Sequence, residues 1–213
     1  MSGYLTMKSY AQNQEDVFVL NYFKSYKGNL LSVGENDGQT FSNARLLIEQ
    51  GWSATLIEPS SVFGKLFNLY QPENRANVRL CNYGIGEKNK VVPFYESGAH
   101  VPGGTDRALV SSTDLAETQR WRKTGVQFTE KDIQLVTFKK FWDGKEQFDF
   151  ISLDTEGHDW SILQQIDLNK VGCRCLCIEW NGNDALHKLF TDYCAKFGLG
   201  LSLSNRENLI FVR

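Results

Sequence analysis

Apolar and polar positions alternate between two kinds of segment along most of the chain. Residues 29–34 (NLLSVG) and 52–59 (WSATLIEP) are short apolar runs bounded by turn residues, a pattern that predicts strands buried on both faces. Between them, residues 40–51 carry apolar side chains at helical spacing and end at Gly51, which predicts a helix. A strand, a helix and a second strand within about 30 residues form a βαβ unit with parallel strands.

The same alternation continues to the end of the sequence. It predicts further helices at 13–28, 61–71, 158–166 and 184–198, and further strands at 77–86, 148–154 and 173–180. We expect Asn13 to cap the first of these helices. Residues 199–205 and 207–213 read as two strands joined by a short turn, which predicts an antiparallel hairpin. The predicted fold is therefore α/β, with a doubly wound, mostly parallel sheet that ends in a C-terminal antiparallel hairpin.

One segment interrupts this alternation. Residues 96–125 are rich in Gly, Ser and Thr and have no sustained periodicity. Long irregular segments in compact domains usually carry function. We interpret 96–125 as a substrate or lid loop. A short helix is expected around 115–123, and a strand is expected to follow around 133–138. His100 and the GGT at 103–105 are candidate substrate contacts in this loop.

Composition narrows the class of protein. With 213 residues, 41% of them hydrophobic, the chain is expected to form a single domain over 1–213. The 23 Lys and Arg against 25 Asp and Glu give a net charge of −2, which disfavours a nucleic-acid partner. No signal-peptide core and no apolar run of about 18 residues occur, so we expect a cytoplasmic protein without a membrane partner. The sequence leaves the oligomeric state open.

The five cysteines fit a reduced interior better than a disulfide framework. Cys173, Cys175 and Cys177 repeat with a period of two, which places them on one face of a strand. A metal site would more often show a CxxC turn. We therefore interpret these three residues as core cysteines.

Candidate functional residues gather where the predicted strands end. In open α/β sheets, ligands bind beyond the carboxyl ends of the strands. The residues at these positions are Gly34, Glu35, Asn36, Asp37, Gly38, Glu58, Pro59, Ser60, Asn82, Tyr83, Gly84, Asp154, Glu156, His158, Glu179 and Asn181. Acids dominate this edge of the predicted sheet.

The loop at 34–38 (GENDG) indicates what kind of ligand this edge binds. Its glycines allow a tight turn, but they do not form the GxGxxG of dinucleotide folds, and Glu35 and Asp37 would repel a phosphate. Glu58, at the end of the second strand, is placed to accept hydrogen bonds from ribose hydroxyls. A nucleoside with a cationic or zwitterionic tail fits, and S-adenosylmethionine is the common one. A nicotinamide-dependent oxidoreductase and a non-catalytic nucleoside-binding module are the alternatives.

The sequence also resembles a known family. The segments that carry the resemblance are YAQNQED at 10–16, 31–52, LIEPS at 56–60, NYGIGE at 82–87 and, above all, FISLDTEGHDWSILQQI at 150–166. From about residue 9 to 181 the chain resembles the FkbM family of S-adenosylmethionine-dependent methyltransferases. The resemblance implies a class I methyltransferase fold, which is Rossmann-like with an antiparallel strand seven. It further implies that the glycine loop holds the methionine part of the cofactor, that Glu58 holds the ribose, and that the segment around Tyr83 and Gly84 holds the adenine.

This chain departs from the family pattern at two positions. Ser32 stands where many members carry an acid in the first strand, and Glu35 stands where a small residue is usual. These changes leave open how the amino group of the cofactor is held, and Glu35 is a candidate for part of that role. Gln12, Gln14, Glu15 and Asp16 are either contacts at the cofactor edge or a solvated helix start.

The stretch after the fourth strand carries the candidate catalytic groups. Asp154, Glu156 and His158 are candidates to accept the proton of a hydroxyl acceptor. The alternative is that they cap the following helix. The two carboxylates and the imidazole also permit a divalent metal, although their spacing does not indicate one. The tetrapeptide DTEG stands where amino-methyltransferases of nucleic acids carry a DPPY-type sequence, so we expect O-methylation of a small molecule or a carbohydrate.

Overall fold

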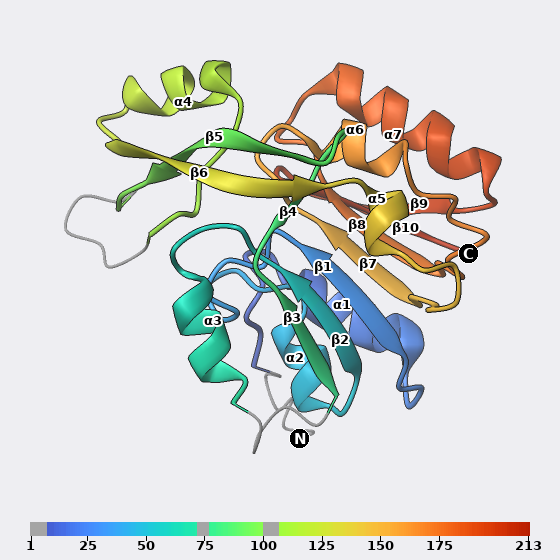
Figure 1. The fold of residues 1–213 in the computed structure, drawn as a ribbon. Coiled ribbons are helices and arrows are strands. Elements are labelled where there is room, and N and C mark those ends of the chain that lie inside the picture. The colour runs from blue at the N-terminus through green and yellow to red at the C-terminus, as the bar shows by residue number, and fades with distance from the viewer. Residues whose placement is uncertain (1–7, 72–76, 100–106) are drawn as a thin grey trace, which may run out of the picture.

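The computed structural model describes residues 8–71, 77–99 and 107–213 (Figure 1). Within this part of the chain, a seven-stranded sheet has the order β3-β2-β1-β7-β8-β10-β9. Its strands are β1 Asn29–Val33, β2 Ser53–Ile57, β3 Val78–Cys81, β7 Phe150–Leu153, β8 Cys175–Glu179, β9 Gly200–Ser204 and β10 Asn208–Val212. The strand order reverses beside β1, because β2 and β7 flank it on opposite sides.

The sheet is parallel except at its C-terminal end. β1 pairs in parallel with both β2 and β7, and Ser32 lies opposite Leu56 on one side and Ser152 on the other. β10 is antiparallel to β8 and to β9. The predicted mostly parallel sheet with a terminal antiparallel hairpin is confirmed.

Helices cover both faces of this sheet (Figure 1). Leu30 packs in a buried cluster with Val19 and Leu47, which lie on α1 and α2. The next residue, Leu31, packs in a second cluster with Ile162 and Phe190, which lie on α6 and α7. Successive strand residues therefore enter different cores, as a strand buried on both faces requires. The helices are α1 Glu15–Phe23, α2 Arg45–Glu49 and α3 Phe63–Leu69 on the first face, and α5 Phe138–Phe141, α6 Asp159–Leu163 and α7 Asp184–Lys196 on the second.

The segment predicted as an irregular loop is bounded by two strands of a second, three-stranded sheet. β5 Lys90–Ser97 pairs along its whole length with β6 Phe128–Val136, and β6 also pairs with the short β4 Gly84–Ile85. The helix predicted around 115–123 is α4 Leu115–Arg122. Figure 1 shows this sheet and α4 lying across one end of the large sheet. The segment predicted as a lid therefore lies between β5 and β6 of this small sheet. His100 and residues 103–105 lie outside the described residues.

Several predicted element boundaries were wrong. The helix predicted at 40–51 is only Arg45–Glu49. The helix predicted at 13–28 is only Glu15–Phe23: Asn13 directs its side chain to Glu15 and Glu207 and does not cap the helix, and Lys24, directly after the helix, has a φ of +55°. The strand predicted at 77–86 divides between the two sheets, as β3 and β4. The strand predicted at 133–138 stops at Val136, because the Thr137 hydroxyl accepts the Lys140 N–H and caps α5.

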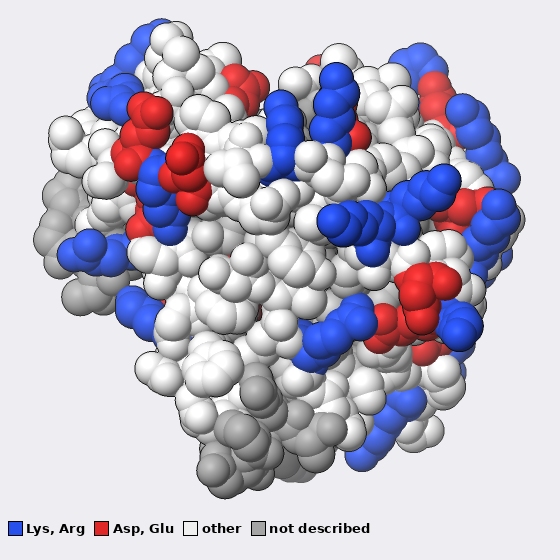
Figure 2. Space-filling model, viewed as in Figure 1, with Lys and Arg blue, Asp and Glu red and all other residues white. Residues whose placement is uncertain are grey.

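The remaining expectations concern the cysteines and the surface. All five cysteines are free and buried, as predicted. Cys175 and Cys177 share one core cluster, whereas Cys173 precedes the strand and packs in the other. In the part of the chain that is described, no helix has the length and apolar character needed to cross a membrane. On the face drawn in Figure 2, basic side chains lie mostly toward the edge with acids among them, and the centre is largely uncharged.

Candidate active site

A cavity of about 1030 Å³ lies at the carboxyl ends of the central strands, between the large sheet and the small one. The large sheet contributes the loops that follow β1, β2, β7 and β8, and the small sheet contributes β4, β5 and β6. The predicted site residues that line it are Gly34, Glu35, Asn36, Glu58, Pro59, Gly84, Asp154, Glu156, His158, Glu179 and Asn181. The predicted residues that do not line it are Asp37, Gly38, Ser60, Asn82 and Tyr83.

Gly34 is required by the close approach of two strand ends. Its φ is +86°, a conformation that residues with a Cβ rarely adopt. A Cβ at this position would lie 1.7 Å from the carbonyl oxygen of Asp154. The glycine therefore lets the loop after β1 pass directly beside the loop after β7, and this proximity brings the predicted cofactor and catalytic residues into one cavity.

Glu58 connects the ends of β1 and β2. Its carboxylate accepts the backbone N–H of Asn36 at 2.8 Å and that of Ser60 at 2.7 Å. The residue is only 5% exposed, and burial raises the pKa of its carboxyl, while these hydrogen bonds oppose the increase. Glu58 thus has a fixed orientation at the cavity wall, and lone pairs of its two oxygens are left for further donors.

The predicted residues outside the cavity support this wall. The Asp37 carboxylate accepts the backbone N–H groups of Gln39 and Thr40, which closes the glycine loop. The Asn82 side chain donates to the carbonyl of Glu58 at 2.9 Å. Gly38 faces α3, where an added Cβ would lie 2.5 Å from a methyl carbon of Leu66. Tyr83 packs against the core on the α6 and α7 side.

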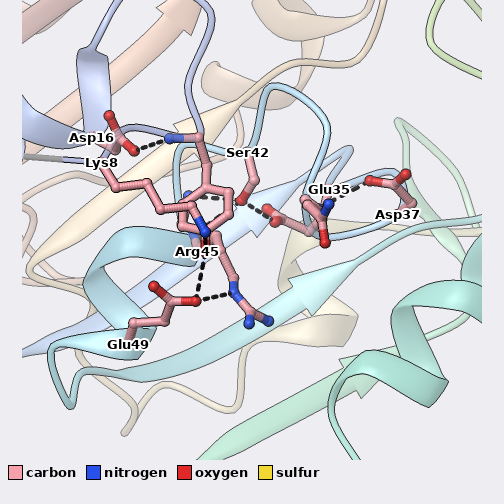
Figure 3. Close-up of polar contacts among 10 residues, drawn as sticks. Lys8, Asp16, Glu35, Asp37, Ser42, Arg45 and Glu49 are labelled. Carbon is pink, nitrogen blue, oxygen red and sulfur yellow. Dashed lines mark hydrogen bonds and ion pairs between the residues drawn. The ribbon is translucent and has the colours of Figure 1, made fainter. Parts of the chain in front are cut away.

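Glu35 is a buried acid on the loop after β1. One of its oxygens accepts the Ser42 hydroxyl at 2.5 Å (Figure 3). The Ser32 hydroxyl, like that of Ser42, favours the ionised form of this carboxyl and opposes a rise in its pKa. Glu35 is 4% exposed, and burial raises the pKa of its carboxyl to about 7. Glu35, Ser32 and Ser42 all line the cavity.

The loops after β7 and β8 supply a second group of acids. Carboxylate oxygens of Asp154, Glu156 and Glu179 lie within 4.8 Å of one another. Burial, reinforced by the neighbouring acids, raises the pKa of Asp154 to about 7 and holds the pKa values of Glu156 and Glu179 well above their ordinary range. These three residues form the group that could hold a cation or accept a proton.

A different acid holds the turn before α6. One oxygen of Asp159 accepts both the backbone N–H and the hydroxyl of Thr155 at 3.0 Å, which closes the turn that leads into α6. His158 occupies the N-cap position, but its side chain makes no capping bond. Its Nε2 lies 2.6 Å from the Thr113 hydroxyl. The capping alternative therefore does not account for the side chains of Asp154 and His158.

The segment before α4 contacts both halves of the site. The Asn36 side chain donates to the carbonyl of Arg107 at 3.1 Å, and the Ser112 hydroxyl donates to the carbonyl of Glu156 at 2.7 Å. Arg120 on α4 lies 4.0 Å from the Glu156 carboxylate. The small sheet and α4 add an apolar wall, which includes Phe94, Leu109, Leu115, Trp121 and Leu135. One wall of the cavity is thus polar and acidic, and the other is apolar.

Sequence reasoning missed the residues that line the cavity from the small sheet and from the terminal hairpin. Phe94 on β5 and Leu135 on β6 could have been found from a partial alternation of apolar and polar positions in these strands. Arg206 and Glu207, in the turn between β9 and β10, have no local signal for a binding role.

In the N-terminal motif the two acids are not solvated, whereas Gln12 and Gln14 are exposed. Glu15 and Asp16 are fully buried. Asp16 accepts the Ser9 hydroxyl at 2.6 Å, while Glu15 accepts the side-chain amides of residues in the terminal hairpin. Both acids hold the segment before α1 in place, and Gln12 in this segment lines the cavity.

Comparisons with solved structures agree with the topology. An FkbM methyltransferase from Methylobacillus flagellatus KT has 14% identity and a TM-score of 0.54 over 88% of this chain and 44% of that one. A ribosomal protein L11 methylase from Lactobacillus delbrueckii subsp. bulgaricus has 10% identity and a TM-score of 0.50, covering 94% and 78%. Sp1610 of Streptococcus pneumoniae, solved in complex with S-adenosyl-L-methionine, has 13% identity and a TM-score of 0.50, covering 95% and 72%.

At these identities the likeness concerns the fold, which is the class I, Rossmann-like fold of methyltransferases. The chain spans less than half of the length of the FkbM structure. No curated protein matches the sequence significantly. The family model described as the methyltransferase FkbM domain matches residues 32–196. Because this match covers most of the sequence, the chain belongs to the FkbM methyltransferase family.

Proposed function

We propose that the protein is an S-adenosylmethionine-dependent methyltransferase that methylates an oxygen of a small molecule or a carbohydrate. The observation that carries this proposal is the single cavity in which Glu58 and the glycine loop meet Asp154, Glu156 and His158. Family membership supports methyl transfer, and the presence of the candidate cofactor residues and the candidate acceptor residues around one cavity supports the proposed roles.

The residues around the cavity fit this cofactor. Glu58 is held by two backbone N–H groups and keeps free lone pairs toward the cavity, as recognition of two ribose hydroxyls requires. Glu35 and Asp154, on the neighbouring loops, create a negative surface that suits a sulfonium and an ammonium. The same acids would repel the pyrophosphate of a nicotinamide dinucleotide, which disfavours the oxidoreductase alternative.

The proposed reaction is a displacement at carbon. When bound, S-adenosylmethionine supplies an electrophilic methyl group on a positively charged sulfur. The acceptor oxygen forms a bond to this methyl carbon while the carbon–sulfur bond breaks and its electron pair stays on sulfur. The hydroxyl proton passes to a base of the protein. Positioning of the acceptor is expected to supply much of the rate.

Three side chains are placed to receive the proton. Asp154 has a pKa of about 7 in the folded protein, which matches it to general-base chemistry near neutral pH. Glu156 and His158 follow it on the same loop and line the same cavity. The Thr113 hydroxyl beside Nε2 fixes the direction of the His158 ring.

The proposal is tested in two steps. Calorimetry should detect binding of S-adenosylhomocysteine. Stabilisation of the folded protein by NAD, and not by S-adenosylhomocysteine, would support the oxidoreductase alternative instead. Mass spectrometry should then detect transfer of a deuterated methyl group from labelled cofactor to a hydroxyl of one compound in a panel of sugars and small alcohols. If the cofactor binds, no label is transferred, and Asp154→Ala and Glu156→Ala change only stability, the protein is a binding module.

A further inference from the structure

The order of strands along the cavity separates the acids into distinct positions. Glu58 follows β2, Glu35 follows β1, Asp154 follows β7 and Glu179 ends β8, and these four strands are consecutive neighbours in the sheet. A nucleoside whose ribose lies at Glu58 therefore extends its tail past the end of β1 before it reaches β7. This arrangement makes Glu35 the first acid that the tail meets.

The Glu35 carboxyl has neighbours that favour its ionised form and oppose the rise in its pKa that burial causes. The Ser42 hydroxyl, before α2, donates to it at 2.5 Å, and the Ser32 hydroxyl, on β1, also favours its ionised form. Donors of this kind stabilise the ionised form of a carboxyl group. Asp154 differs, because no donor to its carboxyl is found among the described residues. A carboxylate with donors suits a permanent cation, whereas one without donors is better suited to accept a proton.

No basic side chain among the described residues neutralises Glu35. Within the described part of the chain, no Lys, Arg or His lies at ion-pair distance from it. Arg45, on α2, turns away and pairs with Glu49 at 2.8 Å (Figure 3). A buried carboxylate without a cationic partner is costly, and a cationic ligand that enters the cavity removes this cost.

We propose that the Glu35 carboxylate binds the α-ammonium group of the cofactor, and that Ser32 and Ser42 hold the carboxylate in position for it. This inference rests on the proposed function, because the ligand is the amino-acid tail of S-adenosylmethionine. It places the binding of the ammonium on the loop after β1 and leaves Asp154 as a candidate base for the acceptor hydroxyl.

The test compares two ligands that differ only in the tail. S-adenosylhomocysteine carries the ammonium, and 5′-methylthioadenosine lacks the amino-acid group. By calorimetry, Glu35→Gln should weaken S-adenosylhomocysteine binding by about 10- to 100-fold, the usual loss of a charged hydrogen bond. The affinity for 5′-methylthioadenosine should stay within about twofold, because that ligand does not reach Glu35.

Two further variants sharpen the comparison. Asp154→Asn is the matched variant on the next loop and should not show the selective loss. A double variant, Glu35→Ala with Ser32→Asp, moves the carboxylate from the loop to β1 and should restore at least part of the affinity for S-adenosylhomocysteine. This double variant also serves as the test if Glu35→Gln does not fold. Equal losses for both ligands in Glu35→Gln, or a selective loss in Asp154→Asn, would overturn the inference. If the unaltered protein binds neither ligand, the proposed function itself fails.

Discussion

The Thr113 hydroxyl lies 2.6 Å from Nε2 of His158. This contact joins the segment before α4 to the loop after β7, and the bond from Ser112 to the carbonyl of Glu156 joins the same two segments. The position of a candidate base is therefore set by the small sheet and α4, which also form the apolar wall of the cavity. Any movement of this wall would change the orientation of His158.

Replacing Thr113 tests this coupling. Thr113→Val keeps the shape of the side chain and removes the hydroxyl, so His158 loses the partner that orients its ring. We expect kcat for the identified acceptor to fall by about three- to tenfold, the value of one hydrogen bond, with cofactor affinity unchanged. Steady-state kinetics measures this effect, and Thr113→Ser is the control that should retain activity. A kcat equal to that of the unaltered protein would show that the Thr113 bond does not orient His158 for catalysis.

Glu58 should control cofactor affinity. Glu58→Gln places an amide N–H₂ near two backbone N–H donors and removes the charge that ribose hydroxyls would bind. We expect the binding of S-adenosylhomocysteine to weaken by about 1 to 3 kcal/mol in calorimetry. Glu130→Gln, an exposed position on β6 outside the cavity, is the matched control for loss of one negative charge. Equal affinities for the two variants would show that Glu58 does not contact the cofactor.

The large sheet could be predicted from local sequence because its strands have a strong local signal. Leu30 and Leu31 enter opposite cores, so β1 is apolar at consecutive positions and is flanked by turn residues. The small sheet lacked such a signal. β5 begins with two exposed residues and carries Pro93 in its middle, and its partner β6 lies more than 30 residues further along the chain.

The site was predictable only where its residues follow predicted strands. Asp154 and Glu58 could be placed at one edge because parallel strands end together. The burial of Glu15 could not be predicted, because the amides that satisfy it belong to Asn205 and Asn208, at the other end of the sequence. Such long-range pairs leave no periodic pattern.

The buried acids predict an unusual pH dependence of stability. The pKa of both Glu35 and Asp154 rises to about 7 in the folded protein, above their ordinary values of 4.5 and 3.8. Between these values and pH 7 the folded state binds more protons than the unfolded chain, so the free energy of unfolding decreases as pH rises. In urea titrations we expect the cofactor-free protein to lose several kcal/mol, as an order of magnitude, between about pH 4.5 and pH 8. Glu35→Gln should reduce this slope, and stability that increases over the same range would contradict the assignment.

Gly34→Ala should be among the most damaging single changes in the chain. The methyl group would lie 1.7 Å from the carbonyl oxygen of Asp154, and φ is +86° at this position. Steric overlap and backbone strain together should cost more than about 3 kcal/mol of the free energy of unfolding. Gly125→Ala separates the two causes, because Gly125 also has a positive φ of +96° but no atom within 4 Å of the added Cβ. This control should lose only about 1 to 2 kcal/mol. Comparable losses for both variants in thermal unfolding would show that the ends of β1 and β7 can separate, and the cavity would then lack a rigid floor.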